Sequence, residues 1–263
     1  MKKTLIIIVL LILIIVSFAF VFLKMSSRGS EFSFFNQNLR YRFGEYQILR
    51  QIFALHNDGD ARLAYLGAKH QKILIEVDQM IGLDRNLEIT DNLLQKLAEK
   101  IKNITGKETS FKYSNITIPY SPAATAEELR KIEEEYRNHD ETNKEAVVYL
   151  LLAIQEGTDL DKLGSTLGEE GIILFQKTFK DSMLKTDARS DTYDNFILST
   201  LLHEFGHQIG LPHNIYPDCL MNAQTEFSNQ IRPDRIINDF CDYEKEEIKK
   251  TLAAYQKNRI FYN

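Results

Sequence analysis

The sequence contains only two cysteines and no long run of basic residues. Lysine and arginine number 32 against 37 aspartates and glutamates, which gives a net charge of −5 at pH 7. Proteins that bind nucleic acid usually carry a basic patch or stripe, so this composition argues against a nucleic-acid partner. Two cysteines would be free thiols in a reducing cytosol, whereas a single disulfide is plausible in an oxidising compartment. The compartment therefore decides their state.

A chain of 263 residues with 44% hydrophobic content can bury one substantial core. We expect one main domain with an appendage at its N-terminus. The expected division is an N-terminal signal anchor at residues 1–28, a stem or juxtamembrane segment at 29–70, and the main domain at 71–263. The oligomeric state does not follow from the sequence.

A long apolar run of leucine, isoleucine, valine and phenylalanine covers residues 5–23, interrupted only by Ser17 and Ala19. As a helix this run spans roughly 28 Å, close to the hydrocarbon thickness of a bilayer. A secretory signal peptide has a shorter apolar region of about 7 to 15 residues. Cleavage after Ala19 would also leave the mature chain with an apolar start at residues 20–23. The pattern therefore favours an uncleaved membrane anchor.

Positive charges flank the apolar run unequally. Lys2, Lys3 and the amino terminus slightly outweigh Lys24 and Arg28. By the positive-inside rule, this places the N-terminus in the cytoplasm and the rest of the chain outside the membrane. We therefore expect a single-pass protein of the cell membrane with an extracytoplasmic main domain.

The segment at residues 29–70 is rich in aromatic and aliphatic side chains but follows no single period. A helix over residues 38–55 explains its pattern best. Three roles stay open for it: a stem packed on the main domain, a helix on the membrane surface, or a segment that keeps the main domain latent.

The main domain contains the sequence His203-Glu204-Phe205-Gly206-His207-Gln208-Ile209-Gly210-Leu211-Pro212-His213, which reads HExxHxxGxxH. Two histidines four residues apart on a helix project from one face, so His203 and His207 can bind one metal ion. Gly210 can end the helix in a left-handed conformation, and the turn can return His213 to the metal. Three imidazoles leave the fourth tetrahedral position open, as in a catalytic zinc site.

Glu204 follows the first histidine, which places its carboxylate beside the same metal. There it could accept a proton from a metal-bound water and act as a general base. The pattern arises by chance on the order of once in 10⁷ positions, so an exposed charged helix face explains it poorly. The sequence thus predicts one catalytic Zn²⁺ ion, with His203, His207 and His213 as metal ligands and Glu204 as the catalytic residue.

The extended motif resembles that of the metzincin clan of zinc peptidases. Cys219-Leu220-Met221-Asn222 adds the clan's second mark, in which Met221 resembles the Met-turn methionine that forms a hydrophobic floor beneath the metal site. The spacing from His213 through Cys219 to Met221, with Cys241 beyond, is similar to archaemetzincins and to exported bacterial matrixin-like peptidases. The resemblance implies a zinc endopeptidase that acts on a peptide or protein substrate.

Archaemetzincins have four cysteines for a second zinc, and this chain departs from that pattern. The matching positions are Asn214, Cys219, Cys241 and Glu244. Only two soft ligands remain, which favours a single zinc ion and, in an oxidising compartment, a disulfide between Cys219 and Cys241. A second zinc and two free thiols stay open as alternatives.

Apolar patterns after Lys72 predict alternating strands and helices. The expected strands are 73–77, 111–120, 146–154, 164–167 and 172–175, and the expected helices are 86–104, 125–136, 190–209 and 243–256. The expected fold is α+β, a metzincin-like zincin with a mixed, mostly parallel twisted sheet, an active-site helix and a C-terminal helix, preceded by a transmembrane helix.

A substrate could bind along one of these strands. Gly164, Ser165, Thr166 and Leu167 form the first of two short strands joined by a turn. The resemblance implies that this strand is the antiparallel edge strand above the metzincin cleft. An exposed strand edge can hold an extended peptide by main-chain hydrogen bonds.

The sequence predicts a membrane-anchored zinc endopeptidase that faces outward. Two other functions stay open. The chain could be a membrane-tethered, non-catalytic module that binds zinc and captures peptides on its edge strand, or a zinc amide hydrolase acting on peptidoglycan. Turnover of a peptide library that stops on chelation separates the endopeptidase from the capture module.

Overall fold

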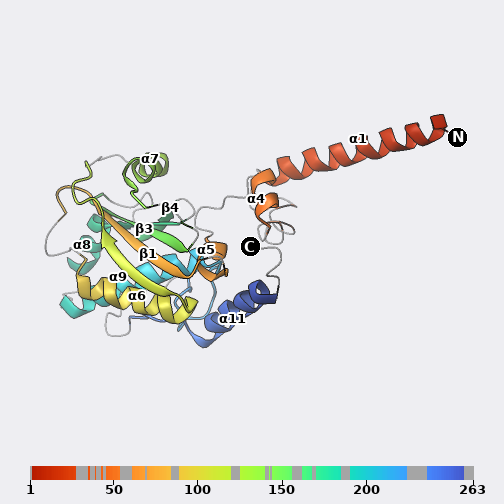
Figure 1. The fold of residues 1–263 in the computed structure, drawn as a ribbon. Coiled ribbons are helices and arrows are strands. Elements are labelled where there is room, and N and C mark those ends of the chain that lie inside the picture. The colour runs from red at the N-terminus through yellow and green to blue at the C-terminus, as the bar shows by residue number, and fades with distance from the viewer. Residues whose placement is uncertain are drawn as a thin grey trace. The chain divides into compact units, whose positions relative to one another are not determined.

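A computed structural model gives the fold of the chain (Figure 1). It describes residues 2–27, 35, 39, 43, 46–53, 61–68, 70–83, 89–119, 125–139, 142, 144–155, 162–167, 170–184, 190–223 and 236–257. The chain divides into two compact units, Met1–His56 and Asn57–Asn263. The second unit begins earlier than the domain boundary expected at residue 71, because a short helix that follows Asn57 belongs to the same hydrophobic core.

The first unit contains helices α1 (Lys2–Ser27) and α4 (Gln47–Phe53). Phe35 and Phe53 are buried in a small aromatic cluster of this unit. The predicted helix over residues 38–55 is present only in part, as α4. Residues 38, 40–42, 44–45 and 54–55 of that prediction lie outside the described residues. Among the helices of the described residues, none combines the length and hydropathy required to cross a bilayer. The transmembrane part of the expected fold is therefore not found there.

Five strands of the second unit form one mixed sheet in the order β2-β1-β3-β5-β4. Their bounds are β1 Lys72–Gln79, β2 Glu108–Tyr113, β3 Glu145–Ala153, β4 Gly164–Leu167 and β5 Gly171–Phe175. The pairings β1–β2, β1–β3 and β3–β5 are parallel, and β4–β5 is antiparallel. The predicted α+β class with a mixed, mostly parallel sheet is confirmed.

The helices of the second unit surround this sheet. They are α5 Arg62–Leu66, α6 Asp91–Thr105, α7 Ala126–Tyr136, α8 Gln176–Leu184, α9 Ser190–Gln208 and α11 Asp242–Lys257. The helix predicted from residue 86 begins only at Asp91, because the Thr90 side chain accepts the backbone N–H of Leu93 as an N-cap. The expected helix over 125–136 is present as α7.

Strand β3 is buried on both faces, which explains its continuous apolar sequence. Val148, Leu150 and Leu152 join a core that includes apolar residues of α6 and α9. Tyr149 and Leu151 join a second core on the side of the sheet that α7 covers (Figure 1). The helix α9, which carries the HExxH sequence, is therefore fixed against one face of the sheet by the larger core.

Candidate metal centre

The end of α9 has the geometry that its sequence predicts. Gly210 adopts a left-handed conformation with φ of 89°. Its N–H donates to the carbonyl of His207 at 2.9 Å, and the N–H of Leu211 donates to the carbonyl of Gly206 at 2.9 Å. These two bonds form a Schellman motif, which reverses the chain after the helix. The reversal brings the segment with His213 back toward the helix.

A side chain at Gly210 would also collide with α5. A Cβ atom placed there would lie 2.0 Å from Cδ and 2.7 Å from Nε of Arg62. The preceding residue, Ala61, donates its N–H to the carbonyl of Gln208 at 2.9 Å. The glycine of the motif thus serves both the turn and the close packing of α5 on it.

The three histidines converge as predicted. Nε2 of His213 lies 3.1 Å from Nε2 of His203 and 3.2 Å from Nε2 of His207. At zinc–nitrogen distances of 2.0–2.1 Å, nitrogens on a tetrahedron lie about 3.3 Å apart. Both distances therefore fit a zinc ion bound by the three histidines, whose ligand atoms all lie within 4.8 Å of one another.

The other ring nitrogens fix the tautomers of two of these histidines. Nδ1 of His203 lies 2.8 Å from the carbonyl oxygen of Leu220, and Nδ1 of His207 lies 3.0 Å from that of Leu211. A carbonyl only accepts, so each Nδ1 must carry the proton. Both Nε2 atoms then present lone pairs toward His213 and cannot donate to it. Backbone carbonyls orient metal-bound histidines in this way. A cation bound between the rings would accept these lone pairs and remove the repulsion between them.

Burial keeps these imidazoles neutral. Loss of hydration, reinforced by the neighbouring histidines, lowers the pKa of His203 to about 3 and that of His207 to about 4. Burial also lowers the pKa of His213, with a smaller contribution from the positive charge of Lys162. Neutral imidazole is the form that binds a metal ion, so the site is ready for a cation at neutral pH.

Glu204 and Met221, which the sequence predicts as the base and the floor of the site, are both buried. Glu204 follows His203 on α9 and is 6% exposed. Met221 is fully buried, and its Sδ would lie 2.3 Å from a Cβ atom at Gly206. The methionine therefore packs on the helix between the two histidines, and the glycine of the HExxH sequence leaves room for it.

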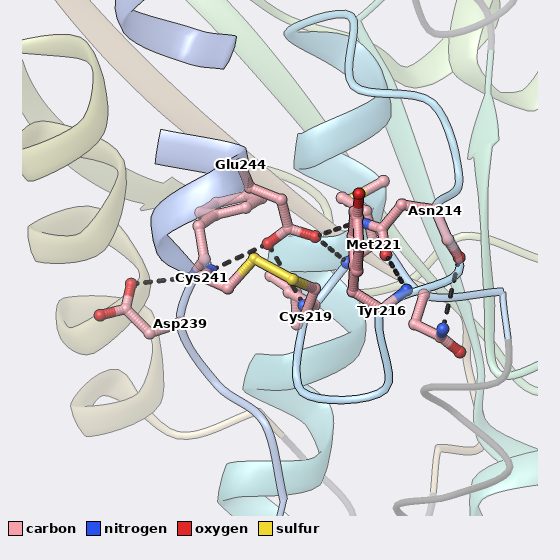
Figure 2. Close-up of a disulfide and its surroundings, with 10 residues drawn as sticks. Asn214, Tyr216, Cys219, Met221, Asp239, Cys241 and Glu244 are labelled. Carbon is pink, nitrogen blue, oxygen red and sulfur yellow. Dashed lines mark hydrogen bonds between the residues drawn. A yellow bond between two sulfur atoms is a disulfide. The ribbon is translucent and has the colours of Figure 1, made fainter. Parts of the chain in front are cut away.

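The four positions that match the archaemetzincin cysteines are brought together (Figure 2). Cys219 and Cys241 form a disulfide. Nδ2 of Asn214 donates to Oε1 of Glu244 at 2.8 Å. Ligand atoms of Glu244 and the two cysteines lie within 4.8 Å of one another, but both sulfur atoms are committed to the disulfide. The arrangement in this structure is a covalent bridge beside a buried carboxylate.

Removal of this disulfide should destabilise the protein. The bridge closes a loop with a sequence separation of 22 residues. A loop of this length contributes about 3 kcal/mol in the chain-entropy model, because the bridge restricts the unfolded chain. We expect the double variant Cys219→Ser/Cys241→Ser to lose about that much free energy of unfolding in urea titrations. Equal stability of oxidised wild type and the double variant would contradict this expectation, as would alkylation of both thiols without prior reduction.

The candidate substrate strand lies beside the metal-binding helix. β4 forms one edge of the sheet, with β5 as its neighbour. A Cβ atom at Gly164 would lie 2.8 Å from Cγ2 of Thr200, which stands one turn before His203 on α9. Ser165 and Thr166 are partly exposed, whereas Gly164 and Leu167 are buried. The antiparallel edge strand expected from the sequence is present next to α9.

Sequence reasoning missed the supporting role of α5. Tyr65 stacks on Phe205 of the motif at a ring distance of 5.4 Å, and its hydroxyl donates to the carbonyl of Val147 at 2.9 Å. This tyrosine therefore ties α9 to the central strand of the sheet. A helix of five residues is too short to show a hydrophobic period, so the pattern of the sequence does not predict α5. Within the turn, the small size of Gly210 is consistent with close packing by another element.

Comparison with protein-family models finds no match, and comparison with curated proteins finds none either. Solved structures similar to this chain include archaemetzincin from Methanopyrus kandleri, with 18% identity, a TM-score of 0.48, and coverage of 71% of this chain and 97% of that one. A zinc-dependent peptidase from Methanocorpusculum labreanum has 16% identity, a TM-score of 0.44, and coverage of 68% and 99%. Archaemetzincin from Archaeoglobus fulgidus, complexed with malonate, has 18% identity, a TM-score of 0.40, and coverage of 68% and 99%. At these identities the likeness concerns the fold alone.

Proposed function

We propose that the chain is a zinc-dependent endopeptidase with a single catalytic zinc ion. One observation carries this proposal. The Nε2 atoms of His203, His207 and His213 converge, while backbone carbonyls hold the protons of two of these rings on the opposite nitrogens. Three imidazoles that converge on one point, with the lone pairs of His203 and His207 directed at it, would leave the fourth position of a bound zinc ion for water or substrate, as in a catalytic site.

We propose the following roles for the residues of this site. His203, His207 and His213 would hold the zinc ion, which would supply a Lewis acid to polarise a scissile carbonyl and to lower the pKa of a bound water. Glu204, beside His203 on α9, takes the proton of the attacking water and passes it to the leaving amine. Met221 packs against Gly206 and supports the helix that carries His203 and His207.

A peptide substrate is proposed to bind along β4. In the sheet that the described residues form, β4 is the outermost strand and could pair with an extended chain, and α9 with the histidines packs against the strand. The residues that offer main-chain groups are Gly164, Ser165, Thr166 and Leu167. Main-chain pairing fixes the direction of a substrate and leaves its side-chain preference to neighbouring pockets.

Hydrolysis of a quenched peptide library, before and after chelation and after zinc is restored, tests the endopeptidase proposal. We expect cleavage that stops on chelation and returns with zinc. Zinc-dependent binding of peptides without cleavage would identify the non-catalytic capture module instead. Release of soluble fragments from peptidoglycan, with no cleavage of any peptide, would identify the amide hydrolase.

We also propose that residues 5–23 anchor the chain in the cell membrane with the second unit outside. This proposal rests on the sequence alone, because none of the described helices meets the length and hydropathy required to cross a bilayer. In the sequence, the 19-residue apolar run and its poor cleavage context support the anchor, and the charges at Lys2 and Lys3 support the orientation. Protease added to intact cells should therefore digest the second unit, with a cytoplasmic protein as the undigested control. A soluble form that begins at Phe20 would reject the anchor. Digestion only after the membrane is opened would reject the orientation.

A further inference from the structure

Glu244 is a buried acid that the proposed chemistry does not use. It lies in the first turn of α11 and is 1% exposed. Its Oε1 accepts the N–H of Met221 at 2.6 Å and Nδ2 of Asn214 at 2.8 Å (Figure 2). Its Oε2 accepts the N–H of Cys241 at 3.0 Å and that of Leu220 at 3.2 Å. All four partners are donors, which matches a carboxylate, because that group only accepts.

One of these bonds leads to a proposed metal ligand through a single peptide group. The peptide group between Leu220 and Met221 is the link, because its N–H, from Met221, donates to Glu244 at 2.6 Å and its carbonyl, from Leu220, accepts Nδ1 of His203 at 2.8 Å. The N–H of Leu220, on the preceding peptide group, donates to the same carboxylate, and the carbonyl of Met221, on the following one, accepts the N–H of Asn214 at 2.8 Å. A carboxylate that holds these N–H groups sets the position of the carbonyl that orients the His203 ring.

The third histidine is reached through Asn214. This residue follows His213 and is bound to Glu244 by its side chain and to Met221 by its backbone. The same carboxylate therefore fixes the residue after one metal ligand and the carbonyl that orients another. The disulfide holds the same loop to Cys241, whose N–H is the fourth donor to Glu244.

We propose that Glu244 is a positioning residue of the metal centre and sets the orientation of His203 and His213 through the backbone of residues 219–222 and through Asn214. This inference rests on the proposed function, because it assigns Glu244 a part in holding the zinc ligands. A residue that only capped α11 would need a single bond, the one to Cys241, which Glu244 makes as the third residue of the helix. The other three bonds leave the helix and reach the segment around the metal.

The test replaces Glu244 by glutamine in the full chain. Glutamine has the same shape, but its NH₂ group would face N–H donors at one of the two oxygen positions, so those donors lose their acceptor. Partners of this kind typically change metal affinity by roughly 10- to 100-fold when they are lost. We expect Glu244→Gln to bind zinc roughly 10- to 100-fold more weakly than the wild type. We also expect a change in the visible absorption of its cobalt-substituted form, which reports ligand geometry.

Glu246→Gln is the matched control, because it makes the same change on the same helix at an exposed position. It should keep wild-type affinity and absorption. A folded Glu244→Gln protein with both properties of the wild type would overturn the inference. If Glu244→Gln does not fold, the test uses Asn214→Ala, which removes only one of the four hydrogen-bond donors to Glu244. We expect this variant also to bind zinc more weakly than the wild type. Wild-type affinity in Asn214→Ala would then overturn it. A wild type that binds no zinc would instead contradict the proposed function. If the wild type binds zinc but cleaves no peptide, the zinc affinities of the variants can still be compared and still test the role of Glu244.

Discussion

Glu204→Gln should keep about one equivalent of zinc while the rate of peptide hydrolysis falls by roughly 10²- to 10⁴-fold, the range for a lost general base. Glutamine fills the same space, and none of the three converging histidines is altered. It cannot take a proton from water at neutral pH, so the loss should appear in kcat with little change in KM. Elemental analysis and steady-state kinetics on one preparation measure both quantities.

Glu246→Gln serves as the control for this prediction as well, because its side chain is exposed on α11. Its hydrolysis rate should equal that of the wild type. Undiminished cleavage by Glu204→Gln would assign the proton transfer to another group. Loss of zinc from that variant would instead give the carboxylate a part in holding the metal.

Replacing His207 by alanine should abolish stoichiometric zinc binding. The change removes one of three ligands and also the bond that ties this ring to the carbonyl of Leu211. Loss of a partner that only orients a ligand weakens metal binding by roughly 10- to 100-fold, so loss of the ligand itself should cost more. Competition with a chromogenic chelator measures the affinity.

The matched control is His139→Ala. The ring of His139 lies 3.2 Å from a carboxylate oxygen of Glu76 and 3.2 Å from Nζ of Lys112, so it belongs to another part of the unit. We expect this variant to keep one zinc ion per chain. Full zinc occupancy in His207→Ala, at the affinity of the wild type, would show that the metal lies elsewhere.

The metal ligands could be predicted from the sequence because their geometry is local. His203 and His207 stand one turn apart on a helix, and Gly210 ends that helix at a defined point. Hydrophobic periodicity likewise placed α7, β3 and the last helix, since each has one long apolar pattern. Local helix geometry is therefore enough to predict the metal-binding histidines without any tertiary contact.

The contacts that hold the site together could not be predicted in the same way. The donors to Glu244 lie between 3 and 30 residues away in the sequence, and no motif relates them. The resemblance to archaemetzincins identifies Glu244 only as a position where those proteins have a cysteine. Three of its four hydrogen bonds depend on how α11 packs against the segment that contains Asn214, Leu220 and Met221. This packing is a tertiary property, and only the bond to Cys241 is local.

Strand ends show a similar limit. Alternation predicted a strand over residues 111–120, whereas β2 runs from Glu108 to Tyr113 and an isolated bridge joins Met80 to Ile118. The N–H of Asn115 donates to a carboxylate oxygen of Asp78 at 2.7 Å and not to a strand partner. A buried side chain thus ends the ladder early, and periodicity carries no information about that competition.

The most direct test of the proposed zinc endopeptidase is the cleavage of a peptide library by the purified full chain as zinc is removed and returned. The account predicts that activity falls to background when the zinc content falls below one ion per chain, and that it recovers in proportion to zinc restored up to one equivalent. Cleavage that persists in the metal-free chain would contradict the account, and so would a chain with one bound zinc ion that cleaves no peptide in the library.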